Sequence, residues 1–218
     1  MPRPSPPGLA APVVLALLMI GCSDGPAPPA ADAPQPTTPA PSEAEPATTP
    51  ADRWWSELTA LCGNAYAGAL VSADEVDADF AEQSMTFHVR RCTPDRLEVP
   101  FHVGEDRSRT WVLTRTDAGL RLQHDHRHED GSEDPVTLYG GTTEDPGTET
   151  AQHFPADAYS QKLFLDHGLD PSVANVWTME LLPGERFSYI LRRPERHFQV
   201  DFDLTQPVDP PPAPWGHG

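Results

Sequence analysis

The chain has 218 residues, a hydrophobic fraction of 38% and a formal net charge of −18 at pH 7. An acidic chain without a run of basic residues lacks the electrostatic footprint of a nucleic-acid-binding protein, so we expect no nucleic-acid partner. An acidic surface also does not favour binding to anionic lipid headgroups by charge. We interpret the acidity as a property that keeps the protein soluble.

Residues 1–21 have the features of an export signal peptide. Arg3 and the α-amino group supply positive charge, and an apolar run from Leu9 to Gly21 follows them. This run holds roughly twelve apolar residues, whereas a helix needs about 20 to cross the hydrocarbon core of a bilayer. We therefore expect a cleaved signal and not a membrane span.

Residues 18–22, with the sequence LMIGC, resemble the lipobox of bacterial lipoproteins, although Met19 stands where that family usually has Leu. The resemblance implies that Cys22 is lipidated and becomes the mature N-terminus. A diacylglyceryl group with an amide-linked acyl chain, such as palmitate, is enough for stable membrane attachment. Ser23, the residue after the cysteine, resembles the outer-membrane sorting pattern of this class. The resemblance implies a protein anchored in the outer membrane and facing the periplasm or the exterior. The alternative is an ordinary secretory signal cut nearby, which leaves Cys22 free.

Proline marks the boundaries of the predicted folded domain. Fourteen of the 27 prolines lie in residues 1–52 and five lie in 207–218, so only eight fall between them. Residues 22–50, rich in Ala, Pro, Thr and Ser, bury too little apolar surface to fold and predict an extended tether. Residues 51–206 then form one β-rich globular domain. The Pro-rich tail, 207–218, is expected to be poorly ordered, although Trp215 could dock.

Beyond Cys22, the chain has only Cys62 and Cys92. An oxidising compartment outside the cytoplasm allows such a pair to form a disulfide. The enclosed loop of roughly 30 residues would stabilise the fold by about 3–4 kcal/mol on the chain-entropy model. The alternative is two buried thiols, and two isolated cysteines lack the paired spacing of a zinc site.

The domain is predicted to be mainly β, with two short helices over about 50–62 and 156–167. Thr49 can cap the first helix, and Pro50 suits its first position. Short turns between apolar, alternating segments predict an antiparallel meander, which closes into a β-barrel or forms a strongly curved sheet. The barrel resembles calycin-like barrels in outline. The predicted strands are 84–92 with 96–103, 109–116 with 120–128, 135–140 with 148–154, 176–182 with 186–192, and 198–204.

A histidine cluster is the one group of residues that predicts chemistry. His124, His126 and His128 are two residues apart, so on a strand they point to the same face. Imidazoles bind Zn and other transition metals, and Glu133 could add an oxygen ligand. The spacing from His126 through His128 and Glu133 to Gly140 resembles part of the first cupin motif, whose two histidines and glutamate bind a metal inside a barrel. The second cupin motif is absent.

The cluster also has a simpler interpretation, as a strand end that enters solvent. Asp125, Arg127 and Glu129 make the opposite face polar, and an acidic stretch, 129–134, follows. We therefore hold three hypotheses. The leading one is a non-catalytic lipoprotein whose β domain binds a small ligand or an envelope protein, which predicts an apolar cavity. The second is a metal-binding protein or metalloenzyme, which predicts that the histidines converge. The third is a structural or assembly role, which predicts a filled barrel.

Overall fold

A computed structural model describes residues 48–218 of the chain. The predicted export signal, Cys22 and nearly all of the predicted tether lie outside this described part. The predicted domain and the Pro-rich tail lie within it. Among the described residues, no helix is both long enough and apolar enough to pass through a membrane.

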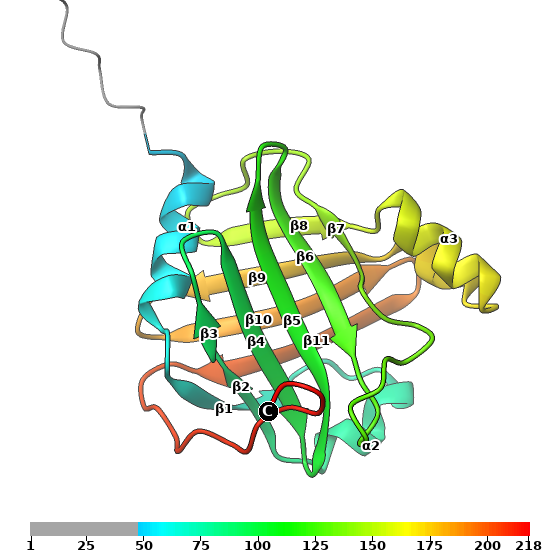
Figure 1. The fold of residues 1–218 in the computed structure, drawn as a ribbon, viewed down its shortest axis with the longest axis horizontal. Coiled ribbons are helices and arrows are strands. Elements are labelled where there is room, and N and C mark those ends of the chain that lie inside the picture. Colours follow the sequence, from blue (N-terminus) through cyan, green and yellow to red (C-terminus); the bar gives the residue numbers. More distant parts are fainter. Residues whose placement is uncertain (1–47) are drawn as a thin grey trace, which may run out of the picture. The chain divides into compact units, whose positions relative to one another are not determined.

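The domain is one antiparallel β-sheet that curves into a nearly closed barrel (Figure 1). The strands pair in the order β7-β6-β5-β4-β2-β1-β11-β10-β9-β8, and the short β3 pairs with β4. The predicted fold class is therefore confirmed. The strands are β1 (Ala65–Leu70), β2 (Met85–His88), β3 (Arg91–Cys92), β4 (Arg96–Val103), β5 (Asp106–Thr116), β6 (Gly119–His126), β7 (Tyr139–Thr142), β8 (Ala151–Pro155), β9 (Val176–Leu182), β10 (Arg186–Arg193) and β11 (Arg196–Asp203).

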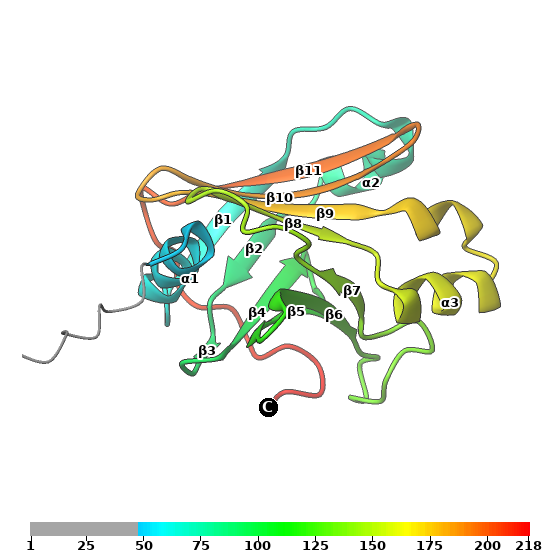
Figure 2. The same cartoon turned by 90° about the horizontal axis from the view of Figure 1, so that it is seen from above.

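The strands form two facing walls, β8–β11 and β4–β7, which β1 and β2 join along one side (Figure 2). The link depends on pairing between β1 and β11, the first and last strands, with Gly68 opposite Phe202. A Cβ atom at Gly68 would lie 2.4 Å from the Phe202 ring. Glycine therefore lets the Phe202 side chain lie flat across β1, inside the core.

The predicted pairing of 135–140 with 148–154 is wrong, because β7 and β8 are the two ends of the sheet. At this seam the Gly140 N–H donates to the Ser160 hydroxyl at 2.7 Å, and the Asp157 N–H donates to the Gly140 carbonyl at 3.0 Å. A Cβ atom at Gly141 would lie 1.8 Å from the Pro155 carbonyl oxygen. Gly141 thus lets the two edges approach closely, while side-chain and loop bonds replace a β ladder.

The helical segments lie at the two ends of the barrel. They are α1 (Pro50–Ala60), the single-turn η1 (Glu75–Asp77), α2 (Ala78–Ala81), α3 (Ala158–Asp166) and η2 (Asp170–Ala174). Helix α1 covers one end, whereas α2 and α3 lie at the other (Figures 1 and 2). Two of these helices were predicted, and the four-residue α2 was not.

Helix α1 closes its end of the barrel with a predominantly aromatic face. Thr49 and Asp52 form a capping box, and Pro50 occupies the first turn, as predicted. Trp54 and Leu58 are fully buried. The predicted disulfide between Cys62 and Cys92 is present and ties the segment after α1 to β3.

The Pro-rich tail is docked on the outside of the barrel, contrary to our expectation of poor order (Figure 1). Val208 bridges to Ala65, and the Trp215 N–H donates to the Arg107 carbonyl at 3.1 Å. The His217 ring lies 2.9 Å from the carboxylate of Asp125 on β6. The tail therefore covers the outer face of the same strand whose inner face carries the predicted histidines.

Candidate functional site

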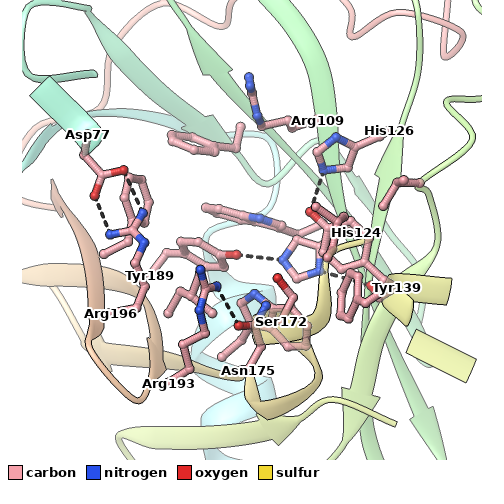
Figure 3. Close-up of a pocket in the computed structure, with 18 of the residues that line it drawn as sticks. Asp77, Arg109, His124, His126, Tyr139, Ser172, Asn175, Tyr189, Arg193 and Arg196 are labelled. Carbon is pink, nitrogen blue, oxygen red and sulfur yellow. Dashed lines mark hydrogen bonds and ion pairs between the residues drawn. The ribbon is translucent and has the colours of Figure 1, made fainter. Parts of the chain in front are cut away.

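The barrel encloses a cavity of about 310 Å³ at the end that carries α2 and α3 (Figure 3). The apolar cavity that the leading hypothesis predicts is therefore present. Its volume is at the lower limit of the range typical of small-molecule sites, about 300–1,000 Å³. Strand alternation places Tyr189, Leu191 and Arg193 of β10 on its wall, and His124 and His126 of β6 opposite.

Eight of the 19 residues that line the cavity are Phe, Tyr or Trp. The rings of Trp111 and Tyr189 stack with centroids 4.4 Å apart, and Phe101 stacks on Trp111 at 5.0 Å. Trp177 lies 4.9 Å from the His124 ring. Stacked rings have few rotatable bonds, so these walls are preformed and present flat apolar faces to the cavity.

His124 is buried and is held by two hydrogen bonds from different strands. Its Nδ1 lies 3.1 Å from the Tyr139 carbonyl oxygen, an acceptor, so Nδ1 carries the proton. Nε2 then accepts from the Tyr189 hydroxyl at 2.7 Å. Burial, followed by the effect of His126, lowers the pKa of His124 to about 3. The imidazole is therefore neutral at physiological pH.

His126, together with His124, Tyr139 and Tyr189, forms a polar strip on the cavity wall. Its Nε2 is hydrogen-bonded to the Tyr139 hydroxyl at 3.0 Å. Burial and the nearby Arg109 guanidinium lower the pKa of His126 to about 4. Burial raises the pKa of Tyr139 to about 12 and that of Tyr189 well above its usual value. The inner polar groups are thus uncharged hydrogen-bonding groups.

A strained backbone position helps to place Tyr139. Leu138 adopts a left-handed conformation, with φ of 58°, which costs a non-glycine residue about 1–2 kcal/mol. Its N–H donates to the His124 carbonyl at 2.7 Å, which anchors the turn into β7. The Tyr139 ring then stacks on His124, with centroids 4.7 Å apart.

The structure does not bring the four predicted metal ligands together. His124 and His126 face the cavity, but His128 is exposed, and its ring lies 4.0 Å from Asp134. Glu133 is also exposed and pairs with Arg127 at 3.2 Å. Within residues 48–218, no group of three or more His, Cys, Asp or Glu side chains is arranged to hold a metal ion. Metal binding by these residues stays a prediction that this geometry does not favour.

Both faces of the β6 segment are polar for a reason that the solvent-exposed interpretation missed. His124 and His126 face the cavity, while the buried Asp125 faces the docked tail and His217. Only the stretch from His128 onward matches the predicted exposed acidic turn. The inner face of this strand is therefore polar because it lines the cavity, and its outer face is polar because it contacts the C-terminal tail.

Sequence reasoning missed cavity residues on both walls of the barrel. Tyr139, Tyr189 and Arg193 were not singled out, and neither Trp111 nor Trp177 was predicted to line a cavity. Both tryptophans are buried, and they line the cavity. The alternation of Tyr189, Leu191 and Arg193 was a usable signal, because it places an arginine on the apolar face of a strand.

No family model, curated protein or solved structure matches this chain at a significant level.

Proposed function

We propose that this chain is an exported, lipid-anchored binding protein that holds a small ligand in the barrel cavity. The preformed cavity of about 310 Å³, with stacked aromatic walls and an uncharged polar strip, is the observation that carries the proposal. Apolar walls with a few placed polar groups are typical of small-molecule sites.

The polar groups of the cavity suit recognition better than catalysis. Both ring nitrogens of His124 are engaged by protein partners, so this imidazole is not free to accept a proton from a substrate. Burial keeps the hydroxyl of Tyr189 protonated and makes it a weak nucleophile at neutral pH. We therefore favour a non-catalytic role.

The position of α1 agrees with a tethered arrangement. The described chain begins at Thr48, beside α1, at the barrel end opposite the cavity (Figure 2). The lipobox-like LMIGC sequence and the Pro-rich segment precede this point. A lipid anchor on Cys22 would therefore be joined to the barrel through the chain that enters α1. Metabolic labelling with palmitate, lost in Cys22→Ser, tests the anchor.

Ligand binding is tested with 2-naphthamide, a neutral bicyclic probe, by calorimetric titration of the full chain carrying Cys22→Ser. We expect saturable binding to this protein. Leu191→Trp should abolish it, because the partly buried Leu191 lines the cavity and a larger side chain fills the space. Leu165→Trp is the matched control, because Leu165 is exposed on α3. Equal effects of the two variants, or no saturable binding of either 2-naphthamide or its carboxylate analogue 2-naphthoate to the parent protein, would contradict the proposal.

A further inference from the structure

The cavity carries positive charge within a strongly acidic protein. Three arginines and one carboxylate line it, namely Arg109, Arg193, Arg196 and Asp77, whereas the chain as a whole has a net charge of −18. The two histidines on its wall are neutral at physiological pH, as shown above. Arginines thus outnumber carboxylates on the cavity wall, although the protein as a whole is strongly acidic.

Two of the three arginines already have carboxylate partners. Arg109 pairs with Asp106 at 2.6 Å. Arg196 makes a bidentate contact with Asp77, with distances of 2.6 and 2.7 Å. It also reaches a second carboxylate, on Asp74, at 2.8 Å. Both guanidinium groups are therefore paired within the protein, and the Arg196 contacts also hold the segment around η1 against β11.

Arg193 differs from both. Its one side-chain hydrogen bond among the described residues goes to the Asn175 amide oxygen, at 3.0 Å, and no carboxylate lies within ion-pair distance of it there. Burial and the nearby Arg196 lower the pKa of Arg193, as expected for a cation without a counter-charge. A partly buried, unpaired cation is costly, so it needs a reason to face a cavity.

Arg193 faces the cavity because side chains alternate between the two faces of β10. Arg193 shares its face of β10 with Tyr189 and Leu191, whereas Arg192 points outward and is exposed. The bond to Asn175 then holds the guanidinium beside the cavity (Figure 3). One N–H is engaged by Asn175, so most of the five donors of the fork stay available.

We infer that the natural ligand is a small aromatic or alicyclic carboxylic acid whose carboxylate pairs with Arg193 while its ring lies against the aromatic wall. This inference rests on the proposed binding function and names its ligand class. A planar guanidinium matches a carboxylate through two parallel hydrogen bonds. The cavity volume of about 310 Å³ favours a compact ring acid over a long acyl chain.

The test compares 2-naphthoate with 2-naphthamide, which has nearly the same shape but no charge. Calorimetric titrations use the full chain carrying Cys22→Ser. We expect 2-naphthoate to bind at least about tenfold more tightly, as charge-assisted hydrogen bonds predict. Arg193→Gln should remove this preference, so that the two probes bind the variant with similar affinities. Arg192→Gln removes the same charge from the outer face of β10 and should leave the preference intact.

The outcomes separate the two claims. If both probes bind the parent protein equally well, the ligand-class inference is wrong and the binding function stands. If Arg192→Gln removes the preference as fully as Arg193→Gln, general electrostatics accounts for it and the role of Arg193 is wrong. If neither probe binds the parent protein, the proposed function and this inference fail together. Circular dichroism of each variant confirms that a lost preference does not reflect unfolding.

Discussion

Aromatic side chains fill the closed end of the barrel, whereas at the open end they line a cavity. At the closed end, α1 directs Trp54, Trp55 and Leu58 into the core, and all three are buried. At the open end, α3 buries only one large apolar side chain, Phe164, while its Leu165 is exposed. Because α3 fills less of the barrel than α1, the aromatic rings beneath it line a cavity.

This difference shows why aromatic content alone does not identify a binding site. At the closed end the apolar faces of the tryptophans contact other side chains, which contributes to stability. At the open end the faces of Trp111 and Trp177 border unfilled space, which costs packing energy that a bound ligand would recover. Stability should therefore depend on the closed end, and binding on the open end.

The largest effect is expected from Trp54→Ala at the closed end. Trp54 is fully buried, so its truncation should lower the free energy of unfolding by about 3–5 kcal/mol. Leu169→Ala at the cavity mouth, where Leu169 is 40% exposed, should lower it by less than about 1 kcal/mol. Urea denaturation followed by circular dichroism measures both changes. Similar losses for the two variants would remove the energetic distinction between the ends.

Much of the barrel could be predicted because its hairpins are local. Strands β4 and β9 match their predicted ranges, 96–103 and 176–182, and β5 and β6 differ from theirs by three residues or fewer at each end. Strand β1 was missed, because its sequence, AYAGAL, contains no β-branched residue. Long-range pairing with β2 and β11 makes it a strand, and such pairing leaves no local pattern.

The candidate site could be predicted only on one wall. The two-residue spacing correctly placed His124 and His126 on one face of a strand. The hydroxyl partner of His124, Tyr189, is 65 residues away in the sequence and on a different strand. Arg193 follows Arg192 just before a turn, a pattern typical of an exposed strand end. Strand alternation puts Arg193 on the face of Tyr189 and Leu191, but the sequence does not show that a cavity lies against that face.

Acidification is expected to have an intermediate effect on the free energy of unfolding. The folded-state pKa of His124 is about 3, against about 6.5 for an exposed histidine, so the unfolded chain binds more protons below pH 6.5. Stability is then complete above pH 6.5 and falls as the pH decreases towards 3. One such histidine accounts for roughly 1.4 kcal/mol per pH unit at the steepest point. Unfolding free energies measured between pH 7 and pH 4.5 give the total slope, to which His102 and His126, with pKa values lowered to about 4, also contribute.

The variant that isolates this effect is His124→Gln, which removes a buried titrating group from the open end. Its stability should fall less steeply with acid than that of the parent protein, by about 1 kcal/mol per pH unit. His128→Gln is the control, because His128 is exposed outside the cavity, and it should leave the slope unchanged. An unaltered slope in His124→Gln would mean that the imidazole at the cavity wall reaches solvent and titrates freely.

The smallest effect is expected from Tyr189→Phe, which removes one hydroxyl from the cavity wall. The variant keeps the stacking of residue 189 on Trp111 but leaves the Nε2 of His124 without its protein donor. An unsatisfied buried acceptor should lower the free energy of unfolding by about 1–2 kcal/mol. Tyr159→Phe, which removes a half-exposed hydroxyl bonded to the Thr137 carbonyl, should change it by less than about 0.5 kcal/mol.

The size of this stability change shows whether the cavity wall at the open end is dry or hydrated. A loss of stability in Tyr189→Phe means that water does not replace the missing donor, so the wall beside His124 is dry and suited to a ring. A neutral result means that cavity water satisfies His124 equally well. The open end would then be a hydrated pocket, and a bound ring would have to displace ordered water to reach the aromatic wall.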